Sequence, residues 1–519
     1  MKRTGESKLV SDASFGRHGA GISVLLAATA LSLSLLSADA WGAAEGVKTE
    51  SIIPPEATKV EHDPSLFGED PSYEDKPYDP QAQYEIYGAK RPAPTPRPLL
   101  ELGRPIYTEG PFEPGINIIG ERNLVFPALS IYGDVKTAVE FNDNGKDERG
   151  QIAVDANLDI DLKLTGTERF HALVEPFDRD GNATRYEFFG DDAAQGEEQI
   201  NGNIEALFFE GDIGQIASGL MDRDAGFDLP VALGFMPIIF QNGVWVDEIF
   251  TGAAFTIPAL NSPALTISNM DFTFFAGIDQ VENPAILDAQ GKRAKHNLDV
   301  YGIAGFVEAN EGYWEFGYGR LEGNDGFSDQ SFNSLTVAFT KRYNRWLSNS
   351  ARAIWTFGQD RNNNADQTAD GFVLLLENSL ITHLPSTLVP YANFFVGLDR
   401  PQPLTDNTGL LKNTGITFEN PGITNFPKLN DSAQDAFGGA IGVQYLFDLH
   451  QQIVVEAATS QRIGGFSRNR AVPDDEYAVG FRYQLPISPE WIVRADGIYG
   501  WRTQNEDIRG VRLELRRKF

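Results

Sequence analysis

The stretch Asp507–Phe519 reads D-I-R-G-V-R-L-E-L-R-R-K-F. Every second position, counted back from the end, belongs to one set: Phe519, Arg517, Leu515, Leu513 and Val511. The positions between them are Lys518, Arg516, Glu514 and Arg512. Because side chains of a β-strand point alternately to its two faces, this segment predicts a strand with one mostly apolar face and one charged face. A strand of a soluble sandwich shows the same alternation, so its recurrence along the chain decides between the two.

The alternation recurs from about residue 128 to the end of the chain. In residues 152–162 aliphatic side chains alternate with Asp155, Asp159 and Asp161, and residues 475–485 and 490–501 repeat the pattern around arginines. A soluble core has room for the apolar set only, yet the opposite set is charged in strand after strand. A barrel with a lipid-facing exterior and a water-filled lumen uses both faces. The sequence therefore predicts an all-β fold, a transmembrane antiparallel up-and-down β-barrel.

The connections between the predicted strands alternate in length, which is typical of short periplasmic turns and long external loops. We read about eighteen strands, a size wide enough for an aqueous channel. With both termini in the periplasm the number of strands is even. It stays even if 213–220 is a strand and 221–248 is one excursion, a single long connection between two wall strands. Two interpretations of 221–248 stay open: it folds into the lumen, or it supplies an irregular wall strand. In the first, its charged residues form a constriction: Asp222, Arg223, Asp224, Asp228, Asp247 and Glu248.

The N-terminal part divides into two further regions. Basic residues precede an uncharged, mostly apolar run from Gly19 to Leu36, and Ala38-Asp39-Ala40 follows, which predicts a cleavable signal peptide over residues 1–40 and secretion through the inner membrane. Residues 41–127 are acidic and rich in proline and lack the apolar content of a core, so we expect a periplasmic extension. Residues 128–519 form the predicted barrel.

Composition limits the partners and the chemistry. The formal net charge of −30 argues against nucleic acid as a partner and suits an exposed surface surrounded by outer-membrane lipid and lipopolysaccharide. The chain has no cysteine, and its 6 histidines stand in no catalytic frame. We therefore expect neither a cofactor nor a bound metal, and no enzyme activity. An outer-membrane lipid-modifying enzyme is kept as the alternative class of function.

The amphipathic strands, the terminal Phe519 and the charged lumen face together resemble the Gram-negative outer-membrane porins, and among them the alginate-export type of channel. The resemblance covers residues 128–519 in size and pattern. It implies that the Phe519 strand is the address read by the outer-membrane insertion machinery. It also implies passive diffusion of small hydrophilic solutes or, in the alginate-export alternative, passage of an anionic polysaccharide along arginines.

The strand registers assign the lumen-facing residues. On the last three strands these are Arg482, Arg494, Asp496, Arg512, Glu514 and Arg516, and the second strand adds Asp155, Asp159 and Asp161. Because acids and bases share one face, we expect paired, partly cancelled charge where the first and last strands meet, and weak ion selectivity. This expectation favours a general pore over an export channel.

Overall fold

A computed structural model describes residues 97–104, 114–179, 181–190, 193–288, 291–361, 367–447, 451–464 and 474–519. The predicted signal peptide and most of the predicted extension lie outside these residues. The described chain is almost entirely β-structure, and no helix in it is long and apolar enough to cross a membrane.

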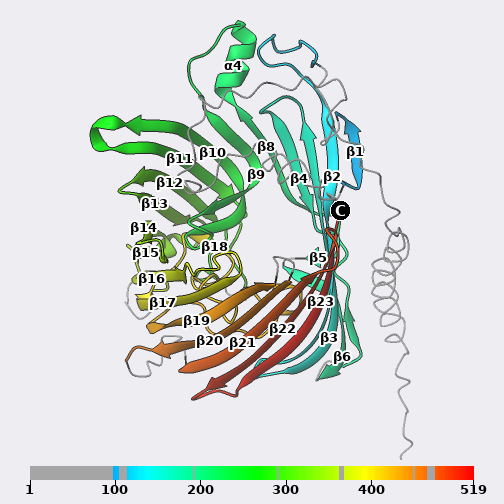
Figure 1. Cartoon of the computed structure of the whole chain (residues 1–519), viewed down its shortest axis with the longest axis vertical. Coiled ribbons are helices and arrows are strands. Elements are labelled where there is room, and N and C mark those ends of the chain that lie inside the picture. The colour runs from blue at the N-terminus through cyan, green and yellow to red at the C-terminus, as the bar shows by residue number, and fades with distance from the viewer. Residues whose placement is uncertain are drawn as a thin grey trace, which may run out of the picture. The chain divides into compact units, whose positions relative to one another are not determined.

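Eighteen antiparallel strand positions form a closed wall (Figure 1). Around the barrel the strands are β2 (Ala128–Asp143), β3 (Glu148–Lys163), β4 (Arg169–Val174) with β6 (Asn182–Gly190), β7 (Gln195–Glu197) with β8 (Ile204–Asp212), β9 (Pro230–Phe240), β10 (Val246–Ser262), β11 (Ile267–Asp279), β12 (Leu298–Ala309), β13 (Gly312–Gly323), β14 (Phe332–Tyr343), β15 (Leu347–Phe357), β16 (Asp370–Leu380), β17 (Leu388–Arg400), β19 (Ala436–Phe447), β20 (Gln451–Arg462), β21 (Glu476–Pro486), β22 (Trp491–Arg502) and β23 (Ile508–Lys518). β4 and β6 share one position because each pairs with a different half of β3. The expected fold class is confirmed.

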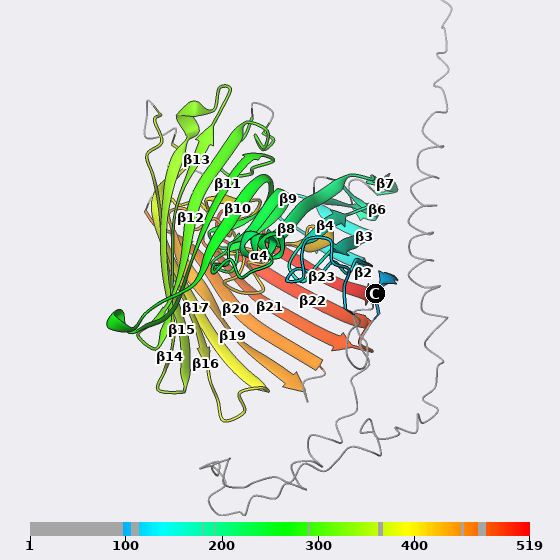
Figure 2. The same cartoon turned by 90° about the horizontal axis from the view of Figure 1, so that it is seen from above.

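The described residues also contain short elements. They are β1 (Leu100–Gly103), β5 (Asp178–Arg179), β18 (Thr405–Asp406), the helix α4 (Ile213–Met221) and the 3-10 turns η3 (Pro263–Leu265), η4 (Ser328–Gln330) and η6 (Gly422–Thr424). We call the end of the barrel that carries Phe519 and the connections 310–311, 344–346 and 487–490 the turn end. The opposite end, with 324–331, 358–361 and 401–435, is the loop end. The β10–β11 hairpin projects beyond its neighbours at the turn end (Figure 2).

The predicted strand over 213–220 is wrong. These residues form α4, and the wall strand is β9, so the second interpretation of 221–248 was correct for its central part. Asp212 begins the helix, since its Oδ1 accepts a hydrogen bond from the Gln215 amide at 2.9 Å. In I-G-Q-I-A-S-G-L-M the apolar residues stand at 213, 216, 217, 220 and 221, which is helical spacing, and the prediction of a strand overlooked this period in a run of only nine residues.

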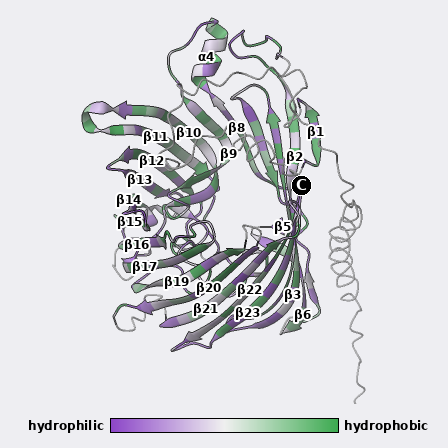
Figure 3. Cartoon of the chain, in the orientation of Figure 1, coloured by the Kyte–Doolittle hydropathy of each residue, from purple (hydrophilic) through white to green (hydrophobic). Residues whose placement is uncertain are grey.

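The outer face of the wall is apolar and carries aromatic side chains near both ends. Toward the loop end, Tyr318, Trp355, Tyr499 and Trp501 are 38–50% exposed. Toward the turn end the exposed aromatics include Tyr343, Trp346, Tyr445 and Phe447. Figure 3 shows hydrophobic and hydrophilic positions interleaved along the strands. An apolar band between two aromatic belts is the exterior of a membrane-spanning barrel.

The barrel closes where β23 pairs with β2, from Asp134↔Lys518 to Asp143↔Arg509. Beyond it, the Phe519 amide donates to the Gly133 carbonyl at 3.0 Å, and the Gly133 amide donates to the Phe519 carbonyl at 2.8 Å. Arg517 breaks the apolar face of β23, and its guanidinium lies 5.4 Å from the centre of the Trp491 ring. The aromatic ring thus supports this charge at the edge of the apolar band.

Two parts of the predicted extension contact the turn end. β1 pairs with Ala128–Ile131 of β2. It therefore occupies the part of the β2 edge that lies beyond the end of β23. Asn123 Nδ2 donates to Glu168 Oε2 at 2.9 Å in the β3–β4 turn. Burial opposes ionisation of Glu168, but hydrogen bonds from Thr165, Asn123 and Thr167 outweigh it and lower the pKa of that carboxyl.

We expect deletion of Phe519 to reduce assembly of the barrel several-fold while secretion continues. The deletion removes both backbone hydrogen bonds to Gly133 and the aromatic end of the closing strand. The measurement is the fraction of the protein in the outer membrane that shows heat-modifiable electrophoretic mobility. The same fraction for the truncated and the full-length protein would contradict the closing role of this strand.

Candidate channel constriction

Two segments leave the wall at the loop end and fill part of the barrel interior. One is the inner hairpin, residues 236–250, which consists of the end of β9, the turn that follows it and the start of β10. The other is the inner loop, residues 401–435, which joins β17 and β19 and contains β18 and η6 (Figure 1). Both carry large apolar side chains that are fully buried, including Met236, Trp245, Phe250, Leu404 and Phe418.

The inner hairpin separates from its neighbours before it turns. β8 pairs with β9 only as far as Phe235, and β11 pairs with β10 only from Thr251. Between these points the hairpin packs on inward-facing residues of β14: Trp245 Nε1 donates to Ser334 Oγ at 3.0 Å. The excursion over 221–248 therefore enters the lumen through its last third and supplies wall through β9.

Glycines on β13 make room for these apolar side chains. A Cβ at Gly317 would lie 2.4 Å from the Trp245 ring, and a Cβ at Gly319 would lie 2.2 Å from Leu404. Neither distance is possible without a shift of the packed side chain. The wall of the barrel is therefore shaped to hold the inner hairpin and the inner loop together.

The inner loop joins the inner hairpin through backbone and charge. β18 runs parallel to the start of β10, and the Leu404 amide donates to the Trp245 carbonyl at 2.8 Å. Lys412 Nζ donates to Asp406 Oδ2 at 2.5 Å and to Asp247 Oδ2 at 2.7 Å. Burial raises the pKa of Asp406 to about 6, although Lys412 and hydrogen bonds from Thr408 act in the other direction.

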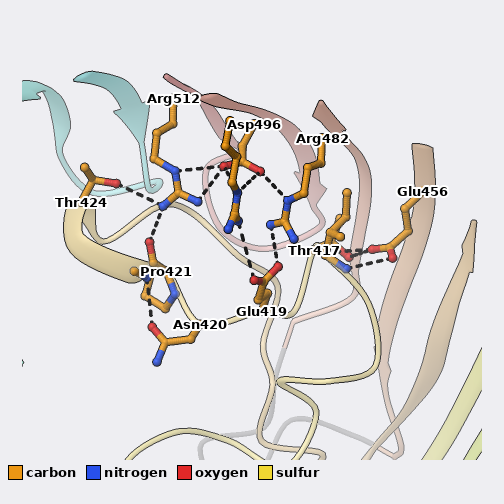
Figure 4. A network of polar contacts seen from close by, with 12 residues as sticks. Thr417, Glu419, Asn420, Pro421, Thr424, Glu456, Arg482, Asp496 and Arg512 are labelled. Carbon is orange, nitrogen blue, oxygen red and sulfur yellow. Dashed lines mark hydrogen bonds and ion pairs between the residues drawn. The ribbon is translucent and has the colours of Figure 1, made fainter. Parts of the chain in front are cut away.

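The far part of the inner loop is held by carboxylates of β20 and β21, and Figure 4 shows the first of them, Glu456. Glu456 of β20, only 2% exposed, accepts hydrogen bonds from the Ile416 amide at 2.9 Å and from the Thr417 amide and hydroxyl at 2.9 and 2.6 Å. Glu476 of β21 accepts one from the Asn430 amide at 2.6 Å. Hydrogen bonds to a charged acceptor contribute about 1.5–3 kcal/mol each, so these contacts fix the loop inside the barrel.

A row of alternating charges runs across the closing strands next to the loop. In register order it contains Arg482 of β21, Asp496 of β22, Arg512 of β23 and Glu140 of β2. Asp496 accepts hydrogen bonds from Arg482 Nε at 2.7 Å and from Arg512 Nη2 at 2.7 Å. Arg494, also on β22, donates to Asp496 from its Nε at 2.9 Å.

The arginines of this row also contact the inner loop (Figure 4). Arg512 Nη1 donates to the Pro421 carbonyl at 2.7 Å, and Arg482 Nη2 lies 2.5 Å from Glu419 Oε2. From β3, Gln151 Nε2 donates to the Thr424 carbonyl at 2.5 Å. The loop therefore makes polar contacts from β20 round to β3.

The other predicted lumen residues are spread over the same wall. Arg516 is paired with Asp134, and Asp155 lies 3.3 Å from Lys136 Nζ. Asp161 lies 3.5 Å from Arg169 Nη1 and 4.0 Å from His171 Nδ1. Asp159 shares their inward face on β3, and Glu514 pairs in register with Arg494 and Ala138.

The constriction predicted on the excursion divides in two. Asp222, Arg223, Asp224 and Asp228 are exposed in the α4–β9 connection at the turn end, away from the inner hairpin. Asp247 and Glu248 belong to the inner hairpin, and the first of them contacts Lys412. The helix α4 and the wall strand β9 explain the division, because they place the two groups at opposite ends of one strand. A deletion of 224–240 would therefore remove a wall strand and could not test the lumen.

Sequence reasoning missed the residues that hold the inner loop, among them Glu456, Thr417 and Glu419. The available signal was the connection 399–435, which is long and contains Leu404, Leu410, Leu411 and Phe418. Such a set is too apolar for a loop surrounded by water. Glu456 is moreover the only charged residue between Gln451 and Gln461.

No protein-family model matches the chain, and no curated protein matches it. Solved structures are similar to it in fold. OccK5 (OpdH) of Pseudomonas aeruginosa matches with 11% identity and a TM-score of 0.49, over 75% of this chain and 98% of that one. OccAB4 of Acinetobacter baumannii matches with 11% identity and a TM-score of 0.49, over 75% and 97%. OpdK of Pseudomonas aeruginosa, solved with vanillate, matches with 12% identity and a TM-score of 0.48, over 75% and 98%.

We expect replacement of residues 404–431 by a short glycine-serine linker to raise single-channel conductance several-fold. Gly397 of β17 and Ala436 of β19 are already paired, so a short linker can join the two strands without strain on the wall. The matched control deletes residues 325–329 of the connection between β13 and β14 and leaves the inner loop unchanged. Conductance equal to that of the control would mean that the inner loop does not narrow the path.

Proposed function

We propose that the protein is an outer-membrane channel for passive diffusion of small hydrophilic solutes, narrowed by the inner loop and the inner hairpin. The observation that carries the proposal is the distribution of side chains over the two faces of one closed wall. Apolar and aromatic residues cover the outside, while paired charges and amides line the inside. Only a water-filled interior makes such a lining stable in a barrel whose exterior faces lipid.

The charged row supports weak rather than strong ion selectivity. The guanidinium groups of Arg482, Arg494 and Arg512 all contact Asp496, and the first two also lie 2.5 and 3.6 Å from Glu419. Because each positive charge has a carboxylate beside it, the field along the pore axis is small and the field across the pore is large. A neutral or weakly charged solute suits such a path best.

An export channel for an anionic polysaccharide is the second candidate. It is favoured by one observation, the gathering of Arg482, Arg494 and Arg512 on neighbouring strands beside the inner loop. A polyuronate needs guanidinium groups that are available to its carboxylates. In this channel it would compete with Asp496 and Glu419 for every one of them.

We expect the change of Arg482, Arg494, Arg512 and Arg516 to Gln to shift the reversal potential toward cation preference while the channel stays open. The change removes four positive charges and leaves Asp496, Glu419 and Asp134 in the lumen. The measurement is the reversal potential of purified protein in planar bilayers under a salt gradient. Arg320→Gln, a half-exposed position on the outer side of β13 near the loop end, is the control.

Two results would decide against the proposal. A wild-type protein with no conductance is not a diffusion channel. A wild type that is strongly anion-selective and is blocked by a uronate oligomer at low concentration is an export channel instead.

A further inference from the structure

A cavity of about 370 Å³ lies beside the inner loop, on its turn-end side. Its walls come from loop residues 412–416 and Glu419 and from the inward faces of β17, β19, β20 and β21. The volume falls within the range of small-molecule binding sites, about 300–1,000 Å³. A solute that passes the loop therefore meets a polar recess, open on one side, before it reaches the turn end.

Side-chain amides dominate the lining of this cavity. Gln444, Gln452 and Gln484 project into it from three successive strands, and the last two are direct cross-strand neighbours. Asn393 and Asn413 add two more amides from β17 and the inner loop, although the Nδ2 groups of these two already donate to the backbone carbonyls of Thr414 and Asn242. Within the described part of the chain the three glutamine amides have no hydrogen-bond partner.

The charges at the cavity are already matched. Lys412 contacts Asp406 and Asp247, and Arg482 contacts Glu419 and Asp496. An ionic solute would have to displace one of these carboxylates or remain without a strong partner. Since a carboxamide offers two donors and one acceptor and carries no charge, the free groups of this cavity match hydroxyls rather than ions.

We propose that this cavity is a binding site for uncharged polyhydroxylated solutes, such as sugars and polyols, and that the channel favours them over carboxylates of equal size. The inference rests on the proposed channel function and specifies its solute. A row of three unpartnered amides beside a neutralised pair of cations exchanges hydrogen bonds with successive hydroxyls of a sugar. The same row offers a carboxylate N–H donors but no opposite charge, so it compensates only part of the carboxylate's lost hydration.

The test uses the purified full chain in planar bilayers and in liposomes. A hexose and the corresponding hexonate are compared by their block of the ion current and by liposome swelling rates. We expect the hexose to block the current in a concentration-dependent way and to enter faster. The triple variant Gln444→Met, Gln452→Met and Gln484→Met keeps side-chain length and removes the donors and acceptors, so the half-blocking hexose concentration rises at least about tenfold.

The control is Gln461→Met, an amide on β20 that hydrogen bonds to Thr459 and Tyr477 away from the cavity, and it leaves the hexose block unchanged. Normal conductance with no effect of hexose on the wild type would overturn the polyol site and leave the channel function intact. A hexonate that blocks at lower concentration than the hexose would overturn it in favour of an anion site. Absence of any conductance would overturn the channel function, and the site with it.

Discussion

The pairing of β23 with β2 is the contact on which the rest of the structure depends. Without it, both strands would leave a row of backbone donors and acceptors in the lipid, and each unsatisfied group costs several kcal/mol there. The pairing also fixes the register. It places Arg512 of β23 opposite Glu140 of β2 and turns both inward. A slip by one residue would turn the charged face of β23 to the lipid and its leucines to the lumen.

Closure of so many strands makes an interior too wide for wall side chains to fill, and the inner hairpin and inner loop occupy part of it. Their apolar residues pack against one sector of the wall, where Gly317 and Gly319 leave space. Their polar contacts lie mainly on the other sector, where Glu456 and Glu476 accept from loop amides. Buried carboxylates are stable only with such partners, so the loop and these glutamates depend on each other. The amide-lined cavity occupies the space between the loop and the turn end.

The sequence was sufficient to predict the wall, because each strand carries its own alternation and the faces of β21, β22 and β23 follow from it residue by residue. The prediction failed for Ile213–Met221, where the apolar residues have helical spacing but the run is short and lies between two strands, and this misplaced one wall strand. The candidate site was only partly predictable. Arg482, Asp496 and Arg512 follow from strand parity, but their contacts with Glu419 and Pro421 depend on where a long loop folds. Local patterns in the sequence do not contain that information, since the partners are tens of residues apart.

The most direct test of the account is whether the inner loop lines the conducting path. The chain has no cysteine, so an Asn413→Cys change gives the protein a single thiol. This position is exposed on the inner loop, beside the cavity. Addition of a bulky water-soluble methanethiosulfonate reagent to single channels in a planar bilayer should then lower the current in one step. The control, Asp325→Cys in the external β13–β14 connection, should leave the current unchanged. Complete modification of Asn413→Cys, verified by mass, with no change in current would contradict the account.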